Sequence, residues 1–128
     1  MNHALSDMLA RIKNAYKVGK KTVSMPYTKL IEAVGNVLIA EKYLGAVKVE
    51  GDIKKTITFD LVYVDGAPAL TSAKMLSVPG VRMYKKSSSL RPVLSGMGIA
   101  VISTSRGVVS DKVARRQKIG GEVLMELW

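Results

Sequence analysis

The chain contains one stretch, Gly98-Ile-Ala-Val-Ile-Ser-Thr-Ser-Arg-Gly107, that decides how its second half folds. The apolar run from Ile99 to Ile102 is continuous, which is typical of a strand buried on both faces. Three hydroxyl side chains and an arginine follow this run without a break. The stretch therefore predicts a buried strand that presents a polar loop at the surface.

The residues after the polar loop predict a short basic helix and a closing strand. Ser110 is a suitable N-cap, and Gly120 lies just beyond residues 111–118, where glycine commonly ends a helix. Apolar residues then alternate through Val123 to Leu127, which places them on one face of a final strand. The sequence thus predicts a strand, a loop, a helix and a strand over residues 98–128.

Asp65-Gly66-Ala67-Pro68 is the best candidate for a domain boundary, because its residue types favour turns. Beyond it, residues 70–77 and 81–86 are predicted strands, separated by a Pro-Gly pair that suits a type II turn. A short helical turn is predicted to begin at the serines 87–89. Residues 67–128 are therefore predicted as a mostly β domain that carries one short basic helix and the main candidate loop.

The first half shows helical and then alternating patterns. Apolar residues from Leu5 to Ile12 recur at helical spacing, and Thr28 can cap a second helix that runs to about residue 42. Gly35 lies inside that second helix, where a close helix contact would explain it. A short strand ending at Pro26 and a β-hairpin over 44–64 complete residues 1–66. We therefore expect an α+β protein of two small domains, the first being helix, strand, helix and hairpin.

The charge balance predicts a polyanionic partner. The chain has 20 Lys and Arg against 10 Asp and Glu, a net charge of +10, and each half contributes ten of the cations. Such an excess favours binding to nucleic acid or to an anionic membrane surface. The chain has no cysteine, so it has no thiolate metal site, and no apolar run is long enough to span a bilayer. We expect a soluble, intracellular protein.

Catalytic patterns are missing from the sequence. His3 is the only histidine, and the acidic residues show no paired-carboxylate or metal-ligand spacing. The Gly-rich segments do not stand between a strand and a following helix, as a nucleotide-binding loop would. The chain is therefore predicted to be no enzyme and to hold no metal or cofactor. A metal-free Ser–Lys enzyme is the remaining enzymatic alternative.

The polar loop, Ser103, Thr104, Ser105 and Arg106, has two interpretations. Its hydroxyls can satisfy local backbone groups in an ordinary turn. They can also bind RNA, because a hydroxyl is both donor and acceptor, as is the ribose 2′-OH, while the arginine reaches a phosphate. The residues alone leave both interpretations open.

Other basic residues are candidates for RNA contact. Arg82, Tyr84 and Lys86 would share one face of a strand, which suits base stacking beside phosphate contacts, although a solvated face is the alternative. The cations of the predicted helix complement its dipole and would also attract RNA over a distance. These helix cations and the similar ones in the first half are Lys112, Arg115, Arg116, Lys29, Lys54 and Lys55.

Four segments of the chain carry a resemblance to a known family. The segments are Ser-Asp-Met-Leu-Ala-Arg-Ile-Lys-Asn-Ala (6–15), Val-Pro-Gly-Val-Arg-Met-Tyr (78–84), Leu-Ser-Gly-Met-Gly-Ile-Ala-Val-Ile-Ser-Thr-Ser-Arg-Gly-Val (94–108) and Gly-Gly-Glu-Val-Leu (120–124). With them the chain resembles the bacterial form of the eighth protein of the small ribosomal subunit. The segments span nearly the whole chain and occur in the family's order, and the longest of them is highly specific.

The resemblance implies two α+β subdomains packed together and a structural role in the small ribosomal subunit, in the cytoplasm. It implies primary binding to an irregular, bulged helix in the central domain of the small-subunit ribosomal RNA, which assists assembly. It also implies contact with neighbouring ribosomal proteins, the fifth small-subunit protein among them. A free translational repressor that binds its own operon messenger RNA is the alternative function.

The resemblance also assigns residues to the RNA. Those that it implies face the RNA are Ser103, Thr104, Ser105, Tyr84, Gly121, Glu122 and Lys29. The chain departs from the family at Asn2-His3-Ala4-Leu5, where an Asp-Pro pair is usual, so no contact is carried over there. Residues 44–66 match the family poorly.

Overall fold

The computed structural model describes residues 3–128 and shows an α+β protein that divides into two units by its internal contacts. One unit comprises residues 3–71, and the other contains residues 72–128. The predicted fold class is confirmed. Residues 1 and 2, which include the beginning of the segment that departs from the family, lie outside the described part.

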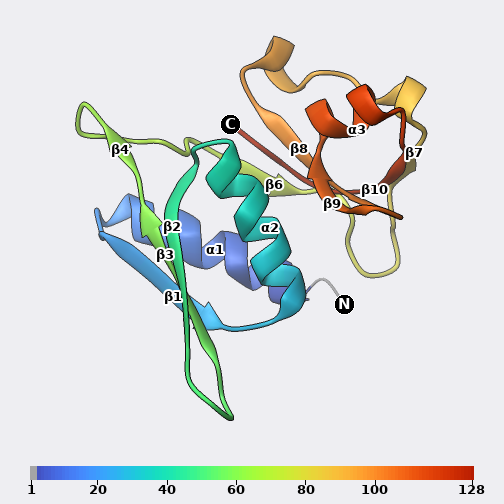
Figure 1. Cartoon of the computed structure of the whole chain (residues 1–128). Helices are drawn as coiled ribbons and strands as arrows, with labels where there is room; N and C mark the ends of the chain where they lie inside the picture. Colours follow the sequence, from blue (N-terminus) through green and yellow to red (C-terminus); the bar gives the residue numbers. More distant parts are fainter. Residues whose placement is uncertain (1–2) are drawn as a thin grey trace. The chain divides into compact units, whose positions relative to one another are not determined.

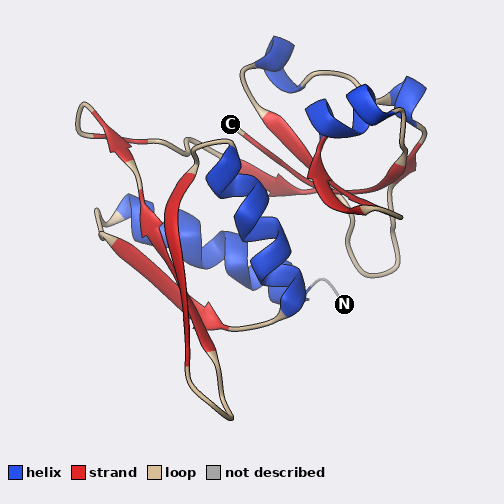
Figure 2. Ribbon diagram, viewed as in Figure 1, coloured by secondary structure: helices blue, strands red, loops and turns tan. Residues whose placement is uncertain are grey.

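The unit of residues 3–71 packs two helices on a three-stranded antiparallel sheet of order β1-β3-β2, as the blue and red ribbons of Figure 2 show. Strands β4 and β5 form a small separate hairpin, which the sequence analysis did not predict. The elements of this unit are α1 (His3–Lys17), β1 (Thr22–Pro26), α2 (Lys29–Ala40), β2 (Leu44–Glu50), β3 (Thr56–Leu61), β4 (Tyr63–Val64) and β5 (Ala67–Pro68).

The predicted periodicities produce this unit's core. The apolar stripe of α1, from Leu5 to Ile12, is buried, and burial alternates along β1 and β3. Thr28 caps α2 as predicted, since its side chain accepts a hydrogen bond from the backbone N of Ile31 at 3.0 Å. The close contact expected at Gly35 is with the sheet and not with a helix: a Cβ there would collide with the ring of Phe59.

The unit of residues 72–128 is built on an antiparallel sheet of order β6-β10-β8-β9, with β7 also pairing with β10 (Figure 1). Strand β8 is buried along its apolar run, as predicted. The elements of this unit are β6 (Ala73–Met75), β7 (Tyr84–Lys85), η1 (Ser87–Ser89), η2 (Val93–Gly96), β8 (Ile99–Thr104), β9 (Gly107–Ser110), α3 (Asp111–Gln117) and β10 (Gly121–Leu127).

The structure corrects several boundaries in this unit. The predicted strands over 70–77 and 81–86 are shorter, because regular pairing is confined to β6 and β7. The sequence predicts that the polar loop leads directly into the helix, but residues 107–110 form strand β9 between them. Ser110 nevertheless caps α3, accepting a hydrogen bond from Val113 N at 3.3 Å.

A candidate nucleic-acid interface

Three candidate residues lie in one row across the second sheet. Glu122 in the centre of the row pairs with Tyr84 of β7 on one side and with Ser103 of β8 on the other. Residues that pair directly across antiparallel strands point to the same face of a sheet. We call Tyr84, Glu122 and Ser103 the reading row, which spans about 10 Å because neighbouring strands are about 4.8 Å apart.

The reading row combines an aromatic ring, a carboxylate and a hydroxyl. The side chain of Tyr84 is 69% exposed, although tyrosine buries well when a core is available. Glu122 is held by Arg82, whose Nη1 lies 3.2 Å from Oε2 of the carboxylate, and the Glu122 side chain is only 13% exposed. The row therefore offers a stacking surface, a fixed acceptor and a hydroxyl that can both donate and accept.

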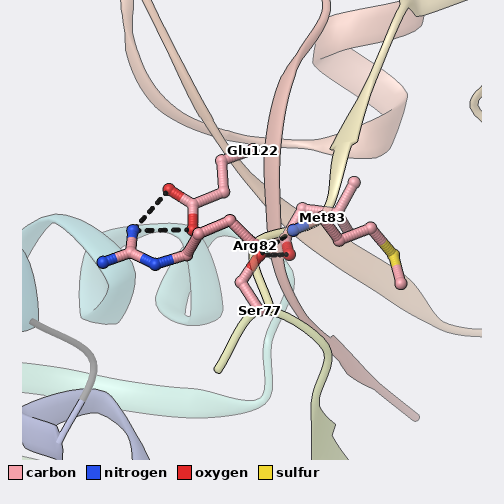
Figure 3. Close-up of polar contacts among 5 residues, drawn as sticks. Ser77, Arg82, Met83 and Glu122 are labelled. Atoms are coloured by element: carbon pink, nitrogen blue, oxygen red, sulfur yellow. Dashed lines mark hydrogen bonds and ion pairs between the residues drawn. The ribbon is translucent and has the colours of Figure 1, made fainter. Parts of the chain in front are cut away.

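A buried serine connects the segment that carries Tyr84 to β10. The hydroxyl of Ser77 donates to the carbonyl of Val123 and accepts from the backbone N of Met83, both at 2.9 Å (Figure 3). Ser77 is fully buried. It was not predicted as a site residue, because a lone serine before a turn gives no sequence signal of such a role.

The polar loop is the tight turn between β8 and β9. Thr104 pairs with Gly107, so Ser105 and Arg106 form a two-residue turn, and both are exposed. The Thr104 hydroxyl donates to Gly107 O at 2.7 Å and accepts from Arg106 N at 3.1 Å. The turn interpretation therefore applies to Thr104. Within residues 3–128, the hydroxyls of Ser103 and Ser105 make no hydrogen bond and are available to a ligand.

Gly121 lets β10 lie between its two neighbours at this point. A Cβ on Gly121 would collide with the carbonyl of Ser103, and one on Gly120 would collide with the carbonyl of Lys85. Only glycine fits this close approach of backbones. The two glycines therefore position the reading row, and the exposed Lys86 follows directly after β7.

The cations of α3 differ in their availability. Arg115 forms an ion pair of 2.6 Å with the buried Asp111, whose other oxygen accepts from the backbone N of Ala100. Asp111 thus ties α3 to β8, and nothing in the sequence indicates this role. Lys112 and Arg116 are exposed on the helix surface.

The remaining predicted lysines belong to the unit of residues 3–71. Lys29 is the exposed first residue of α2, and Lys54 and Lys55 lie in the loop between β2 and β3. The Lys55 ammonium lies 5.5 Å from the centre of the Tyr27 ring, and the Lys55 carbonyl accepts from Tyr27 N at 3.0 Å. Lys54 and Lys55 line a surface depression together with Tyr27.

The described residues offer no metal centre. No group of three or more His, Asp or Glu among residues 3–128 is arranged to hold a metal ion. No helix in the same range is long and apolar enough to cross a membrane. The side chains of the reading row suit recognition by stacking, hydrogen bonds and charge.

Comparisons with known proteins agree with the resemblance seen in the sequence. A family model described as Ribosomal protein S8 matches residues 3–128. The chain is 42% identical over 124 residues to the small ribosomal subunit protein uS8 of Tolumonas auensis, covering 97% of this chain and 95% of the relative. With the same coverage, it is 44% identical to the protein of that name from Neisseria meningitidis serogroup C and 43% identical to the one from Stutzerimonas stutzeri.

Proposed function

Since this chain belongs to the ribosomal protein S8 family, we propose that it is a structural component of the small ribosomal subunit and binds the subunit's RNA directly. The family consists of structural ribosomal proteins, so the prediction that the chain is not an enzyme is confirmed. The RNA site that we propose is an irregular, bulged helix of the central domain, and binding there assists assembly of the subunit.

The observation that carries this proposal is the reading row. An exposed tyrosine, a fixed carboxylate and a free hydroxyl on one sheet face suit the splayed bases and 2′-hydroxyls of an irregular RNA helix. Ser105 and Arg106 extend this surface at the exposed turn. A protein that bound RNA by charge alone would need cations but would not need such a row.

The basic residues supply affinity for RNA but do not distinguish one RNA site from another. The unit of residues 72–128 carries ten Lys and Arg against three acidic residues. Two of those acids, Asp111 and Glu122, are ion-paired with arginines. Phosphate contacts from the remaining cations would bind any RNA and release counterions.

The most direct test is a nuclease footprint of the purified chain on small-subunit ribosomal RNA. We expect protection of one irregular helix at protein concentrations that leave the rest of the RNA open. Diffuse protection of many helices would contradict the proposal, because it would show that the chain binds RNA through charge and does not recognise a particular site.

Substitutions in the reading row and in the adjoining turn can be compared with a substitution of a cation. We expect Tyr84→Ala and Ser105→Ala to weaken binding to the protected helix by on the order of tenfold each, because stacking contributes about 1–3 kcal/mol per base and a hydrogen bond about 0.5–1.5 kcal/mol. Both should leave binding to a random RNA duplex nearly unchanged. Filter binding or fluorescence anisotropy with both RNAs measures this difference.

The charge variant Lys112→Gln is the control for those two. It should weaken binding to both RNAs by a similar factor and reduce the salt dependence of both. If all three variants lost equal affinity on the two RNAs, the reading row would have no role in site choice.

The finer partners rest on the family resemblance alone. We propose that the fifth small-subunit protein is a neighbour of this chain and that an operon messenger RNA carrying a mimic of the ribosomal site is a second ligand. Sedimentation of a cell extract separates the two roles: a subunit component travels with small subunits, whereas a free repressor stays with messenger RNA or with the unbound fraction.

A further inference from the structure

A shallow basic depression lies beside the reading row and shares Tyr84 with it. Its walls come from β7, the beginning of η1 and the C-terminal end of α3. The residues that line it are Tyr84, Lys85, Lys86, Ser87, Lys118, Gly120 and Gly121. We call this depression the lysine seat. Three of its seven residues are cations, and none is acidic.

The charges of the lysine seat are not used inside the protein. Within the described residues 3–128, no carboxylate pairs with Lys85, Lys86 or Lys118. By contrast, the neighbouring Arg82 and Arg115 are both held by acids. Lys85 also lines a second depression, together with Asp111 and Glu126. The like charges of Lys86 and Lys118 repel one another, and an anion between them would relieve that repulsion.

The backbone of Lys118 adds a second observation. Lys118 ends α3 in the left-handed conformation, with φ 56° and ψ 43°. Glycine or asparagine commonly occupies this helix-ending position, because a Cβ is strained there. A lysine at this position is therefore unfavourable for folding. The same conformation places its cation at the end of the helix, where the seat lies.

We propose that the lysine seat binds one backbone phosphate of RNA and that Lys118 is a phosphate-contact residue. This inference rests on the proposed function, because the phosphate belongs to the RNA strand whose bases meet the reading row. A phosphodiester fits better than an acidic protein segment, since Tyr84 borders both the seat and the row, and RNA carries a phosphate beside every base. A phosphate contact also fixes the register of the strand on the row.

The chain supplies a matched control for Lys118. Lys42 is exposed, follows α2 and is also left-handed, with φ 67°. Lys118→Gly and Lys42→Gly therefore remove the same charge and relieve the same backbone strain. We expect both variants to unfold at the same temperature as the wild type or a few degrees higher, measured by circular dichroism.

The two variants should differ in RNA binding. We expect Lys118→Gly to weaken binding to the footprinted ribosomal RNA helix about fivefold and to reduce the slope of log affinity against log salt by about one. Lys42→Gly should change the affinity less than twofold. Asparagine tolerates the left-handed conformation and carries no charge, so Lys118→Asn should behave like Lys118→Gly. Arginine keeps the charge, so Lys118→Arg should keep the wild-type slope.

Three results would overturn the inference. Equal effects of Lys118→Gly and Lys42→Gly on the salt slope would reduce Lys118 to a general surface charge. An unchanged affinity for naked RNA together with a loss of incorporation into assembled subunits would assign the seat to a protein neighbour. If Lys118→Asn bound RNA like the wild type, the backbone at this position, and not the charge, would be responsible for the weaker RNA binding of Lys118→Gly. A wild-type protein without a specific footprint would instead refute the proposed function itself.

Discussion

At the scale of single residues, one buried hydroxyl positions the tyrosine of the reading row. Ser77 hydrogen-bonds to both sides of the contact between residues 77–83 and β10, and neither partner is its neighbour in sequence. Met83 O also accepts from Val123 N at 2.8 Å, so the segment before Tyr84 is fixed at several points. The geometry of the row thus depends on a residue that cannot touch RNA.

Replacing this hydroxyl should affect both stability and site choice. We expect Ser77→Ala to lower the free energy of unfolding by about 1–3 kcal/mol, because two buried backbone groups lose a partner. It should also weaken binding to the specific helix more than to random duplex, because Tyr84 is no longer held beside Glu122. Urea unfolding and RNA titration measure the two effects.

Ser24→Ala is a suitable control for this change. The Ser24 hydroxyl is hydrogen-bonded to that of Thr58 at 2.8 Å, but the pair is exposed, so its loss should cost only a few tenths of a kcal/mol. If Ser77→Ala destabilised the protein without altering the ratio of the two RNA affinities, Ser77 would be a structural residue only.

At the scale of elements, Tyr16 connects α1 to two other segments of its unit. Its hydroxyl donates to Tyr43 O at 2.6 Å and accepts from Val62 N at 3.0 Å, and its ring meets that of Tyr63 edge-on. Burial raises the pKa of Tyr16 above its ordinary value, and the hydrogen bond from Val62 partly opposes this effect. The neutral hydroxyl is therefore the form that the fold requires.

This pKa shift predicts how stability depends on alkaline pH. A raised folded-state pKa gives stability that is present below the unfolded value of about 10 and is lost as the pH rises through the folded value. We expect Tyr16→Phe to lower the free energy of unfolding by about 1–3 kcal/mol at pH 7. Between about pH 9 and pH 11, the free energy of unfolding should then fall less in this variant than in the wild type. Urea unfolding at a series of pH values checks this.

Tyr63→Phe controls for the loss of a tyrosine hydroxyl in the same region, since it removes the hydrogen bond from Tyr63 to Lys20 O. That variant should keep most of the wild-type decline at high pH, because burial, and not the neighbouring Tyr63, is the largest cause of the raised pKa of Tyr16. Equal alkaline declines in the wild type and Tyr16→Phe would show that other groups dominate the titration.

The elements that the sequence predicted well are those with a period or a cap. The stripe of α1, the continuous apolar run of β8 and the caps Thr28 and Ser110 each leave a local pattern that tertiary contacts reinforce. The sequence does not predict strand β9, because its four residues run from exposed Gly107 to buried Ser110 without a clear alternation. The strands β6 and β7 are shorter than predicted because each pairs with only part of β10.

The candidate site was predictable as residue types but not as an arrangement. Tyr84, Ser103 and Glu122 were named as candidates, yet their alignment depends on a register among three strands that are distant in sequence. The pairing of Arg115 with Asp111 and the role of Ser77 depend on burial, which no spacing reveals. The predicted helix over 111–118 includes Lys118, because nothing in the sequence indicates its left-handed backbone.

At the scale of the whole molecule, charge and recognition are distributed differently. Each half of the chain carries ten Lys and Arg, whereas the reading row belongs to residues 72–128 alone. General attraction to RNA is therefore a property of the entire chain. Choice of site is a property of one sheet face, whose stacking and hydrogen bonds respond weakly to salt.

This separation predicts how salt affects specificity. Raising the salt from about 50 to about 200 mM should weaken binding to the specific helix and to random duplex by at least about tenfold each, because both depend on counterion release. Their ratio should fall by no more than about fourfold, the effect of the one additional phosphate held in the lysine seat. Parallel titrations at several salt concentrations measure the ratio. A ratio that fell together with the affinities would show that cations, and not the reading row, select the site.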